Sequence, residues 1–219
     1  MGRELRTAVA ASGRGAADRR ARPHGRRLRG ARRLRPAAAS PPRARAAGAA
    51  RHFTDRIVRP GDQAFFDVIH SFNGYRTCYY RTFGVGWATP EQRDAYAKAR
   101  EWMDAALDAI KPGVSSDTVA RTLPRAQDFG FGSELAAFGL QFAHGLGLGL
   151  HERPIISRFN SLEHPIELKA GMVFAMEAYC PAADGISAAR IEEEVVVTDY
   201  GTEILTRFPA IDLPIAAGY

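Results

Sequence analysis

The chain has 219 residues, of which 30 are Lys or Arg and 24 are Asp or Glu, giving a formal net charge of +6. The positive excess lies wholly in residues 1–50, which contain 14 Arg, no Lys and two acidic residues, whereas the remaining residues carry 16 basic and 22 acidic side chains. This distribution removes the main support for a nucleic-acid-binding function of the whole chain, and no apolar run reaches the roughly 20 residues that a membrane-spanning helix requires.

Residues 1–50 differ in composition from the rest of the chain. They are rich in Arg and Ala and contain almost no large apolar side chains, so they cannot bury enough surface to offset the entropy of ordering. We predict that this segment is disordered. A basic arm that binds RNA or acidic lipid is an alternative; we favour an artefact of gene prediction, since a wrong reading frame of GC-rich DNA gives such a sequence. We therefore divide the chain into residues 1–50 and one domain at residues 51–219.

The cysteine content indicates the compartment. Cys78 and Cys180 are the two cysteines of the chain, and neither belongs to a CxxC pair. Two cysteines are too few for a disulfide framework, which is typical of a reducing compartment. We therefore expect a cytoplasmic protein.

The first part of the domain predicts a β-hairpin. A turn at residues 60–62 precedes a continuous apolar run at residues 64–69, which indicates a buried strand. A second strand, rich in aromatic residues and Thr, is predicted over residues 75–85. Residues 71–74 supply the turn between the two strands.

Two helices are predicted next. Thr89 is a favourable N-cap for the first, Pro90 suits its first helical position, and the sequence Lys111-Pro112-Gly113 ends it. Apolar residues recur at helical spacing along this segment, which predicts a stripe that faces the core. A second helix is predicted over residues 115–129, with a kink at Pro124.

A Gly-rich run at residues 142–154 follows the helices. Glycine at every second position between His144 and His151 disfavours a helix, so we predict a strand or extended loop whose backbone approaches another group closely. No GK[ST] sequence accompanies these glycines, which argues against a nucleotide site. Three further strands are predicted near residues 172–178, 189–198 and 203–206.

Several acids and histidines lie on or beside these apolar strands, where an unpaired charge would cost much free energy. They are Asp67, His144, His151, Glu177, Glu192 and Glu193. Each acid alone is best explained by a salt bridge at a strand end. Together they indicate a site, because buried carboxylates normally need a metal, a cation or a shared proton.

These residues, in this order, resemble the pita-bread family that includes methionine aminopeptidase, prolidase, aminopeptidase P and creatinase. The resemblance covers residues from about 51 to 209 and implies an α+β pita-bread fold. The metallopeptidases of this family carry five ligands: two aspartates eleven positions apart across a hairpin, a histidine and two glutamates. Asp67, His144, Glu177 and Glu192 match four of them. His151 matches a second family histidine.

The fifth ligand position departs from the family pattern. Cys78 stands eleven positions after Asp67, where the second aspartate is expected. A thiolate cannot bridge two metal ions as that carboxylate does, but an Asp/Cys/His/Glu/Glu set would hold a single ion. The resemblance thus implies a divalent metal, Zn, Mn or Co, or none, because the hairpin is similar to that of the metal-free creatinase. Alternatively, Cys78 is only a small buried side chain.

The resemblance also implies roles for the other residues. In the metal version Glu177 handles the proton and His151 stabilises the oxyanion. In the metal-free version a histidine activates water while Asp67, Glu177 and Glu192 hold a cationic small molecule. His52, fifteen positions before Asp67, corresponds to a family histidine upstream of the first aspartate or, as an alternative, is only a loop histidine.

Two further residues are candidates for substrate binding. Arg190, two positions before Glu192, would clamp a substrate carboxylate or form an ion pair with Glu192 or Glu193. Tyr75, at the start of the second strand, is the other candidate; as an aromatic residue it is equally suited to the core or to a pocket wall.

The predicted function is a hydrolase of C–N bonds in peptides or small amides, similar to an Xaa-Pro peptidase. The alternatives are a creatinase-like metal-free amidinohydrolase or amidohydrolase and a non-catalytic binding module. Retention of His144, His151, Glu177 and Glu192 argues against the binding module. Relatives resembling creatinase are dimers, which implies a homodimer.

We also expect the fold to be incomplete. Family members place one or more helices before the strand that holds Asp67, and residues 1–50 show none. Without such a flank, apolar surface beside the first hairpin would be exposed. This truncated form is therefore expected to be less stable than a full-length relative, and its activity is left open.

Overall fold

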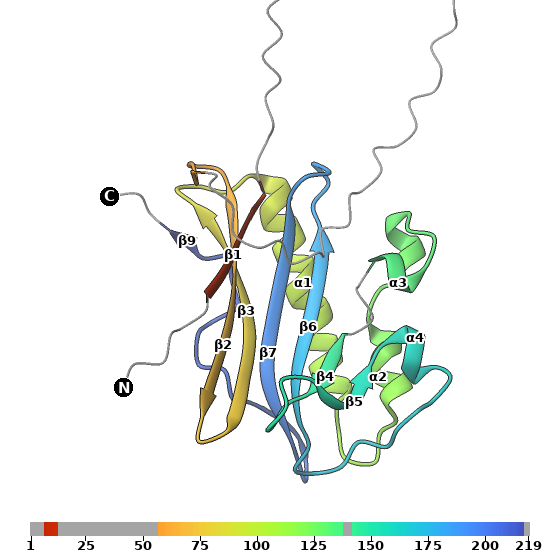
Figure 1. Ribbon diagram of the computed structural model, residues 1–219. Coiled ribbons are helices and arrows are strands. Elements are labelled where there is room, and N and C mark those ends of the chain that lie inside the picture. Colours follow the sequence, from red (N-terminus) through yellow and green to blue (C-terminus); the bar gives the residue numbers. More distant parts are fainter. Residues whose placement is uncertain (1–6, 13–56, 138–141, 217–219) are drawn as a thin grey trace, which may run out of the picture.

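The computed structural model describes residues 7–12, 57–137 and 142–216. Its strands form two sheets, one with the order β1-β2-β3-β9 and one with the order β5-β4-β6-β7-β8 (Figure 1). The strands are β1 Thr7–Ser12, β2 Gln63–Phe72, β3 Tyr75–Val85, β4 Ala143–Gly145, β5 Glu152–Ile156, β6 Val173–Pro181, β7 Ala188–Thr198, β8 Gly201–Ile204 and β9 Ile215–Ala216. The helices are α1 Pro90–Ala109, α2 Ser116–Thr122, α3 Glu134–Ala137 and α4 Arg158–Ser161, with a 3₁₀ helix at Ala126–Phe129.

The predicted hairpin is confirmed as β2 and β3, which pair in an antiparallel register from Gln63 opposite Gly84 to Phe72 opposite Tyr75. Asn73 and Gly74 form its two-residue turn, both with positive φ, 49° and 91°. Asn-Gly is the dipeptide that adopts this conformation most readily, and its twist matches that of the strands. The turn therefore fixes which residues of β2 and β3 share a face.

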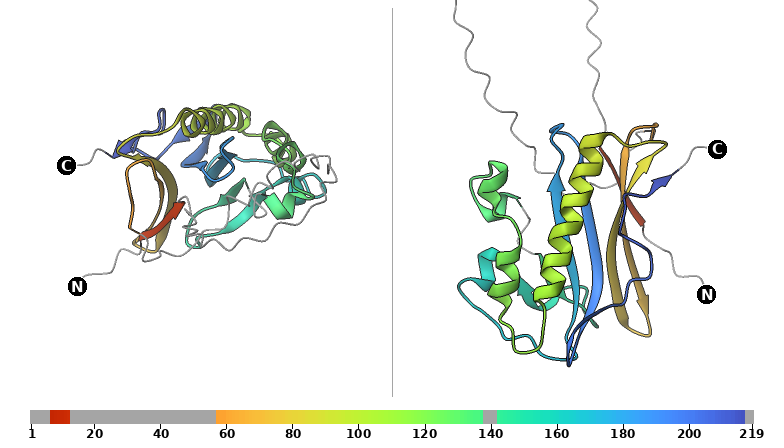
Figure 2. Two further views of the ribbon diagram at one scale, coloured as in Figure 1. Left: turned by 90° about the horizontal axis from the view of Figure 1, so that it is seen from above. Right: turned by 180° about the vertical axis from the view of Figure 1, so that it is seen from behind.

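Helix α1 is also confirmed. Thr89 and Gln92 form a reciprocal capping box at its start, and Pro90 is its first residue. Its apolar stripe, which includes Met103 and Ala106, packs on one face of β6 and β7 (Figure 2). This packing forms the main core and leaves the opposite face of β6 and β7 for other residues.

The second predicted helix is wrong beyond Thr122. Helix α2 ends there because Leu123, which precedes Pro124, is extended, as the clash with the proline ring demands. Residues 126–129 then form a separate 3₁₀ helix. The last predicted strand is displaced by two residues, since β8 spans Gly201–Ile204.

Within residues 1–50, the structure describes one stretch, Thr7–Ser12. This short stretch forms β1 and pairs antiparallel with β2, from Thr7 opposite Val68 to Ser12 opposite Gln63. It is free of charged residues, and β2 offers an unpaired edge to its backbone. Residues 13–56, which include His52, lie outside the described residues.

Polar side chains, the buried Thr82 and the half-buried Glu194, join the two sheets where β3 lies against β7. The Thr82 hydroxyl accepts a hydrogen bond from the Arg190 backbone N–H at 2.9 Å and donates one to the Arg190 carbonyl at 2.8 Å. The Glu194 carboxylate accepts one from the Cys78 backbone N–H at 2.6 Å. These contacts hold the inner faces of both sheets in a fixed relation.

The outer face of β2 and β3 carries an apolar hollow of about 470 Å³. Its lining includes Val58, Phe66, Val68, Phe83 and Phe208. This agrees with the expected exposure of apolar surface beside the first hairpin. Among the described residues, no helix covers this face as α1 covers β6 and β7 (Figure 2).

Candidate metal centre

Because side chains alternate between the two faces of a strand, the candidate residues of β4, β6 and β7 lie on the same face of their sheet. On β7, Arg190, Glu192 and Glu194 face the site, whereas Ile191 and Val195 belong to the core under α1. Glu177 on β6 lies opposite Glu192, and His144 on β4 lies opposite Ala175 of β6. Side chains two residues apart on a strand share a face, so each strand supplies one or more groups to the same place.

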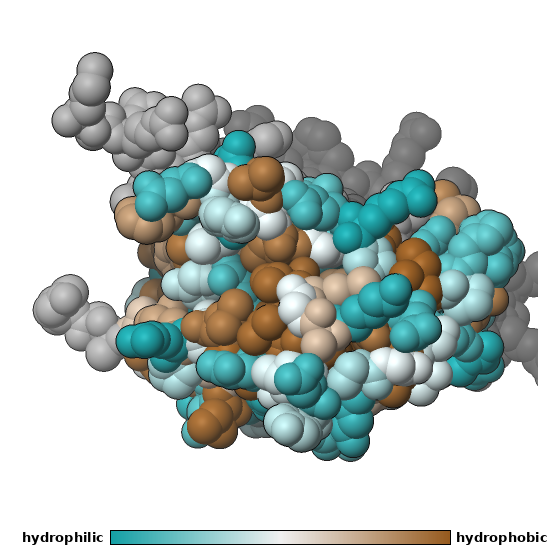
Figure 3. Space-filling view, turned by 90° about the horizontal axis from the view of Figure 1, so that it is seen from below, coloured by the Kyte–Doolittle hydropathy of each residue, from teal (hydrophilic) through white to brown (hydrophobic). Residues whose placement is uncertain are grey.

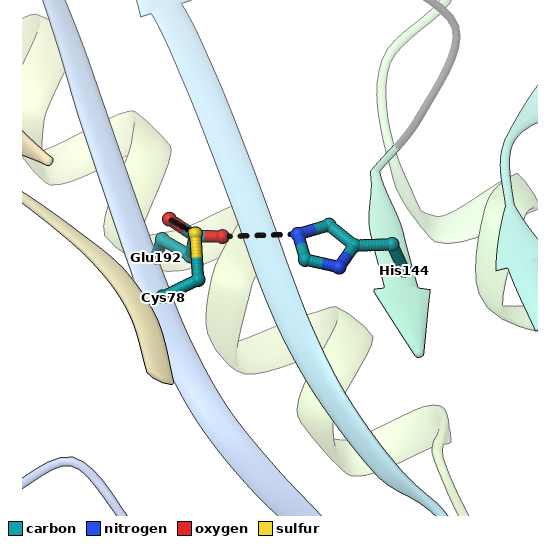
Figure 4. Close-up of side chains that lie close together, drawn as sticks. All are labelled: Cys78, His144 and Glu192. Atoms are coloured by element: carbon teal, nitrogen blue, oxygen red, sulfur yellow. Dashed lines mark hydrogen bonds and ion pairs between the residues drawn. The ribbon is translucent and has the colours of Figure 1, made fainter. Parts of the chain in front are cut away.

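The hairpin supplies the rest of the cluster. Cys78 of β3, His144 of β4 and Glu192 of β7 point toward one another (Figure 4), and one donor atom from each lies within 4.8 Å of the others. The Cys78 Sγ lies 3.7 Å from Glu192 Oε2 and 3.7 Å from Asp67 Oδ1. The His144 Nε2 lies 3.6 Å from Glu192 Oε1 and 4.0 Å from Glu177 Oε1. The structure therefore gathers Asp67, Cys78, His144, Glu177 and Glu192 in one place.

Burial makes this cluster electrostatically expensive. His144 and Glu192 are 0% exposed, Glu177 2% and Cys78 4%. Burial and, after it, the charge of Glu177 raise the pKa of Glu192 well above its usual range. Burial also raises the pKa of Asp67 and of the Cys78 thiol and lowers the pKa of His144. Each shift reports the cost of a buried charge, which a bound cation would offset for the acids and the thiol.

Two atoms of the cluster lack a hydrogen-bond partner among the described residues although both are buried: His144 Nε2 and Glu192 Oε1. His144 Nδ1 lies 3.0 Å from the Gly145 carbonyl oxygen and donates to it, so the lone pair is on Nε2. Two ligands about 2.1 Å from an ion at tetrahedral angles lie about 3.4 Å apart. The 3.6 Å between these atoms is close to that separation, so the residues fit a divalent cation.

Arg190 lies beside this cluster. Its Nη2 donates to Glu177 Oε2 at 2.6 Å, and the Tyr179 hydroxyl donates to the same oxygen at 2.6 Å. The guanidinium carbon lies 3.2 Å from the centroid of the Tyr80 ring and 4.5 Å from that of Tyr179. The expected ion pair of Arg190 with Glu192 or Glu193 is therefore wrong: the partner is Glu177.

Glu193 has a different role from its neighbour. It points to the opposite face of β7, where its carboxylate lies 2.9 Å from Arg81 Nη2 and 3.5 Å from Arg100 Nη1. Arg81 also donates to the carbonyls of Glu192 and Phe208. Glu193 thus belongs to a buried ion-pair network that fixes the strand backbone at Glu192, outside the cluster itself.

The Gly-rich run forms β4 and a loop that returns along it. A Cβ at Gly145 would lie 2.7 Å from the Arg153 carbonyl oxygen, so the predicted close approach is to the chain's own backbone. The loop carries His151, which is exposed and whose ring centroid lies 4.2 Å from that of His144. His151 therefore lies at the rim of the cluster.

Tyr75 is not brought to the cluster. It is 64% exposed beside the hairpin turn, and its pairing with Phe72 places it on the opposite face of the sheet from Cys78. The nearby end of the molecule shows apolar side chains gathered around a hollow (Figure 3). Exposed Phe72 and Leu148 add to the apolar surface near this turn.

Comparison with known proteins assigns the family. The sequence model of metallopeptidase family M24 matches residues 14–199, which is most of the chain. The chain belongs to this family. A Xaa-Pro dipeptidase of Pyrococcus furiosus is 32% identical over 159 residues, which cover 70% of this chain and 42% of that protein. The chain thus spans less than half the length of the curated relatives that it matches.

Solved structures agree with this assignment. A dipeptidase from Mycobacterium ulcerans superimposes with a TM-score of 0.63 and 30% identity, over 78% of this chain and 44% of that one. An X-Pro aminopeptidase from Thermotoga maritima gives a TM-score of 0.67 over 96% of this chain and 49% of that one, but at 24% identity it shows the fold alone. The predicted α+β pita-bread fold of the M24 family is confirmed.

Sequence analysis missed Tyr179 and Glu194 as parts of this M24 site. Both lie two residues from a predicted ligand on the same strand, Tyr179 from Glu177 and Glu194 from Glu192. The period of two would have placed them on the ligand face. Their contacts, to the Glu177 carboxylate and the Cys78 backbone, depend on the other strands and could not be inferred.

Among the helices of the described ranges, none is long and apolar enough to cross a membrane.

Proposed function

We propose that the chain is the catalytic half of a hydrolase that cleaves C–N bonds in small peptides, with Xaa-Pro dipeptides as the first substrates to test. The observation that carries the proposal is the convergence of Cys78, His144 and Glu192 with two buried donor atoms that lack a partner among the described residues. The names of the M24 relatives, which include Xaa-Pro dipeptidases, support the substrate class.

The proposed cofactor is a divalent metal held within the cluster of Asp67, Cys78, His144, Glu177 and Glu192. A carboxylate, imidazole and thiolate set is a normal donor set for such ions. The ion would supply Lewis-acid polarisation of the scissile carbonyl. The chain's own residues would do the rest.

Glu177 is the proposed proton carrier. Its Oε2 is fixed by Arg190 and Tyr179, whereas its Oε1 faces His144 at 4.0 Å, so the carboxylate is oriented with one oxygen toward the reacting groups. His151, at the exposed rim, is the proposed donor to the developing oxyanion. His52 and Tyr75 stay predictions, and no described contact supports either.

The test is release of proline from Ala-Pro by the full chain, supplied in turn with Zn²⁺, Co²⁺ and Mn²⁺. Glu192→Gln should abolish hydrolysis, because it removes a charged group from the cluster. Glu203→Gln is the matched control, since Glu203 is exposed on β8, and it should retain the wild-type rate. Equal rates in wild type and Glu192→Gln would refute the proposal.

A metal-free amidinohydrolase is the second candidate. Cys78 in place of a ligand aspartate favours it, because three carboxylates, the half-buried Asp67 and the buried Glu177 and Glu192, would then remain to hold a cationic guanidinium. Release of urea from creatine that persists after exhaustive chelation would establish this activity. Loss of activity on chelation, restored by a divalent ion, would exclude it.

We also propose that the protein is cytoplasmic and forms a homodimer. Cys78 and Cys180, the cysteines of the chain, are both free and buried, which suits a reducing compartment. Light scattering on the purified protein should give about twice the 23.9 kDa mass of one chain. A mass of one chain at all concentrations would contradict the dimer.

A further inference from the structure

We propose that the site holds a single borderline-soft ion, Zn²⁺ or Co²⁺, on three protein ligands: Cys78 Sγ, His144 Nε2 and Glu192. Glu177 and Asp67 are kept out of the coordination shell by hydrogen bonds within the chain. This rests on the proposed function in one respect, that the cluster is a metal site. The inference goes beyond the proposed function because it states how many ions bind, which residues are their ligands and which metals the site prefers.

The division between ligands and non-ligands follows from which atoms are already paired. Glu177 Oε2 accepts hydrogen bonds from both Arg190 and Tyr179 at 2.6 Å. Asp67 accepts one from the Tyr80 hydroxyl. By contrast, His144 Nε2 and Glu192 Oε1 are buried and have no hydrogen-bond partner in the described part of the chain. The buried atoms of the cluster without a hydrogen-bond partner in that part are therefore those of His144 and Glu192, and the Cys78 sulfur lies 3.7 Å from Glu192 Oε2.

Arg190 holds Glu177 in this arrangement. Its guanidinium lies over the rings of Tyr80 and Tyr179, so its planar donors have little freedom to follow a moving carboxylate. To bind an ion through Oε2, Glu177 would have to break a charge-assisted hydrogen bond in a buried place, where such bonds are strong. Its Oε1 lies 4.0 Å from His144 Nε2, farther than Glu192 Oε1 at 3.6 Å. Arg190 also places one fixed positive charge beside Asp67 and Glu192. This reduces the need for a second cation.

Cys78 restricts the site to one ion. A carboxylate at this position can place one oxygen on each of two ions, whereas a cysteine has a single donor atom. Cys78 offers one sulfur, which lies 3.7 Å from Glu192 Oε2. Three protein ligands with a fourth position open is the arrangement of catalytic zinc sites. The thiolate disfavours Mn²⁺ and Mg²⁺, which prefer oxygen ligands.

The first experiment is titration of the chelator-treated full chain with Co²⁺, followed by absorption spectroscopy and elemental analysis. One ion per chain and a thiolate-to-cobalt charge-transfer band in the near ultraviolet are expected. Cys78→Ser should remove the band, whereas Cys180→Ala should keep it, because Cys180 lies in the core under α1. Two ions per chain, or a band that survives in Cys78→Ser, would overturn the inference.

The second experiment compares two isosteric variants by competition with a chelator of known affinity. Glu192→Gln should weaken Zn²⁺ binding by more than about 100-fold, since loss of partners outside the coordination shell already costs roughly 10–100-fold. Glu177→Gln should cost at least about 10-fold less than Glu192→Gln. Equal losses would show that Glu177 is a ligand and overturn the three-ligand site.

The outcomes separate this inference from the proposed function. Hydrolysis of Ala-Pro with two bound ions would leave the function standing and refute the single-ion site. One thiolate-bound ion without hydrolysis of any peptide would support the single-ion site and refute the proposed function. Circular dichroism of each variant shows whether it is folded, and the wild-type stoichiometry and band decide the inference even if a variant fails to fold.

Discussion

Replacement of Arg81 by methionine tests how the two sheets are held together behind the site. Arg81 extends from β3, is 1% exposed, and bonds to the Glu193 carboxylate at 2.9 Å and to the carbonyls of Tyr80, Glu192 and Phe208. Methionine has a similar volume but none of these donors. The variant therefore leaves the buried Glu193 carboxylate with only Arg100, 3.5 Å away.

Loss of one partner of a buried ion pair costs about 3–5 kcal/mol, because the remaining charge stays buried. The free energy of unfolding of a domain of ordinary stability is about 5–15 kcal/mol, so Arg81→Met should lower the urea midpoint by about a fifth or more. Arg100→Met is the control: its side chain is 17% exposed and its other partner, Asp104, is 55% exposed, so about 1 kcal/mol is expected.

A small loss of stability in Arg81→Met would refute this reasoning. A loss below about 1 kcal/mol in Arg81→Met, equal to that in Arg100→Met, would show that the buried network contributes little. The double change Arg81→Met with Glu193→Leu should recover part of the loss, because it removes the stranded carboxylate. If the double variant is as unstable as the sum of the single ones, the charge of Glu193 is not the cause.

Three other outcomes are expected. Gly145→Ala should destabilise the protein by about 1–3 kcal/mol in urea denaturation, because its Cβ would lie 2.7 Å from the Arg153 carbonyl oxygen; a neutral effect would contradict the close approach. Cys180, whose pKa burial raises to about 11, should resist iodoacetamide at pH 8 in the native protein and react in urea, since little thiolate exists so far below that pKa; equal rates would contradict its burial. Addition of Zn²⁺ at 100 times its Kd should stabilise the chelator-treated protein by about 2.7 kcal/mol, seen as a rise in Tm that variants lacking Glu192 do not show; an equal rise in those variants would place the ion elsewhere.

The sequence predicted the features that depend on local pattern. The Asn73-Gly74 turn, the Thr89 cap and the alternation on β6 and β7 each follow from neighbouring residues, and the structure has them where expected. The gathering of Asp67, His144, Glu177 and Glu192 was predicted from the family resemblance. Composition and periodicity alone would not have brought four separate strands together.

The features of the fold and the site that were not predicted depend mostly on tertiary contacts, which no local sequence pattern encodes. The choice of Glu177 as the partner of Arg190 depends on β6 lying beside β7 in one register. The pairing of Thr7–Ser12 with β2 depends on a free strand edge, which the composition of residues 1–50 does not reveal. The early end of α2 at Thr122 was predictable, because Pro124 disfavours a helical Leu123.

X-ray absorption spectroscopy of the zinc-loaded protein tests the central claim most directly, that side chains from separate strands converge on one cation. We predict one sulfur at about 2.3 Å from the zinc, with nitrogen and oxygen ligands at about 2.0–2.1 Å, from Cys78, His144 and Glu192. Absence of sulfur from the coordination shell, or scattering from a second metal at about 3.5–4 Å, would contradict this arrangement.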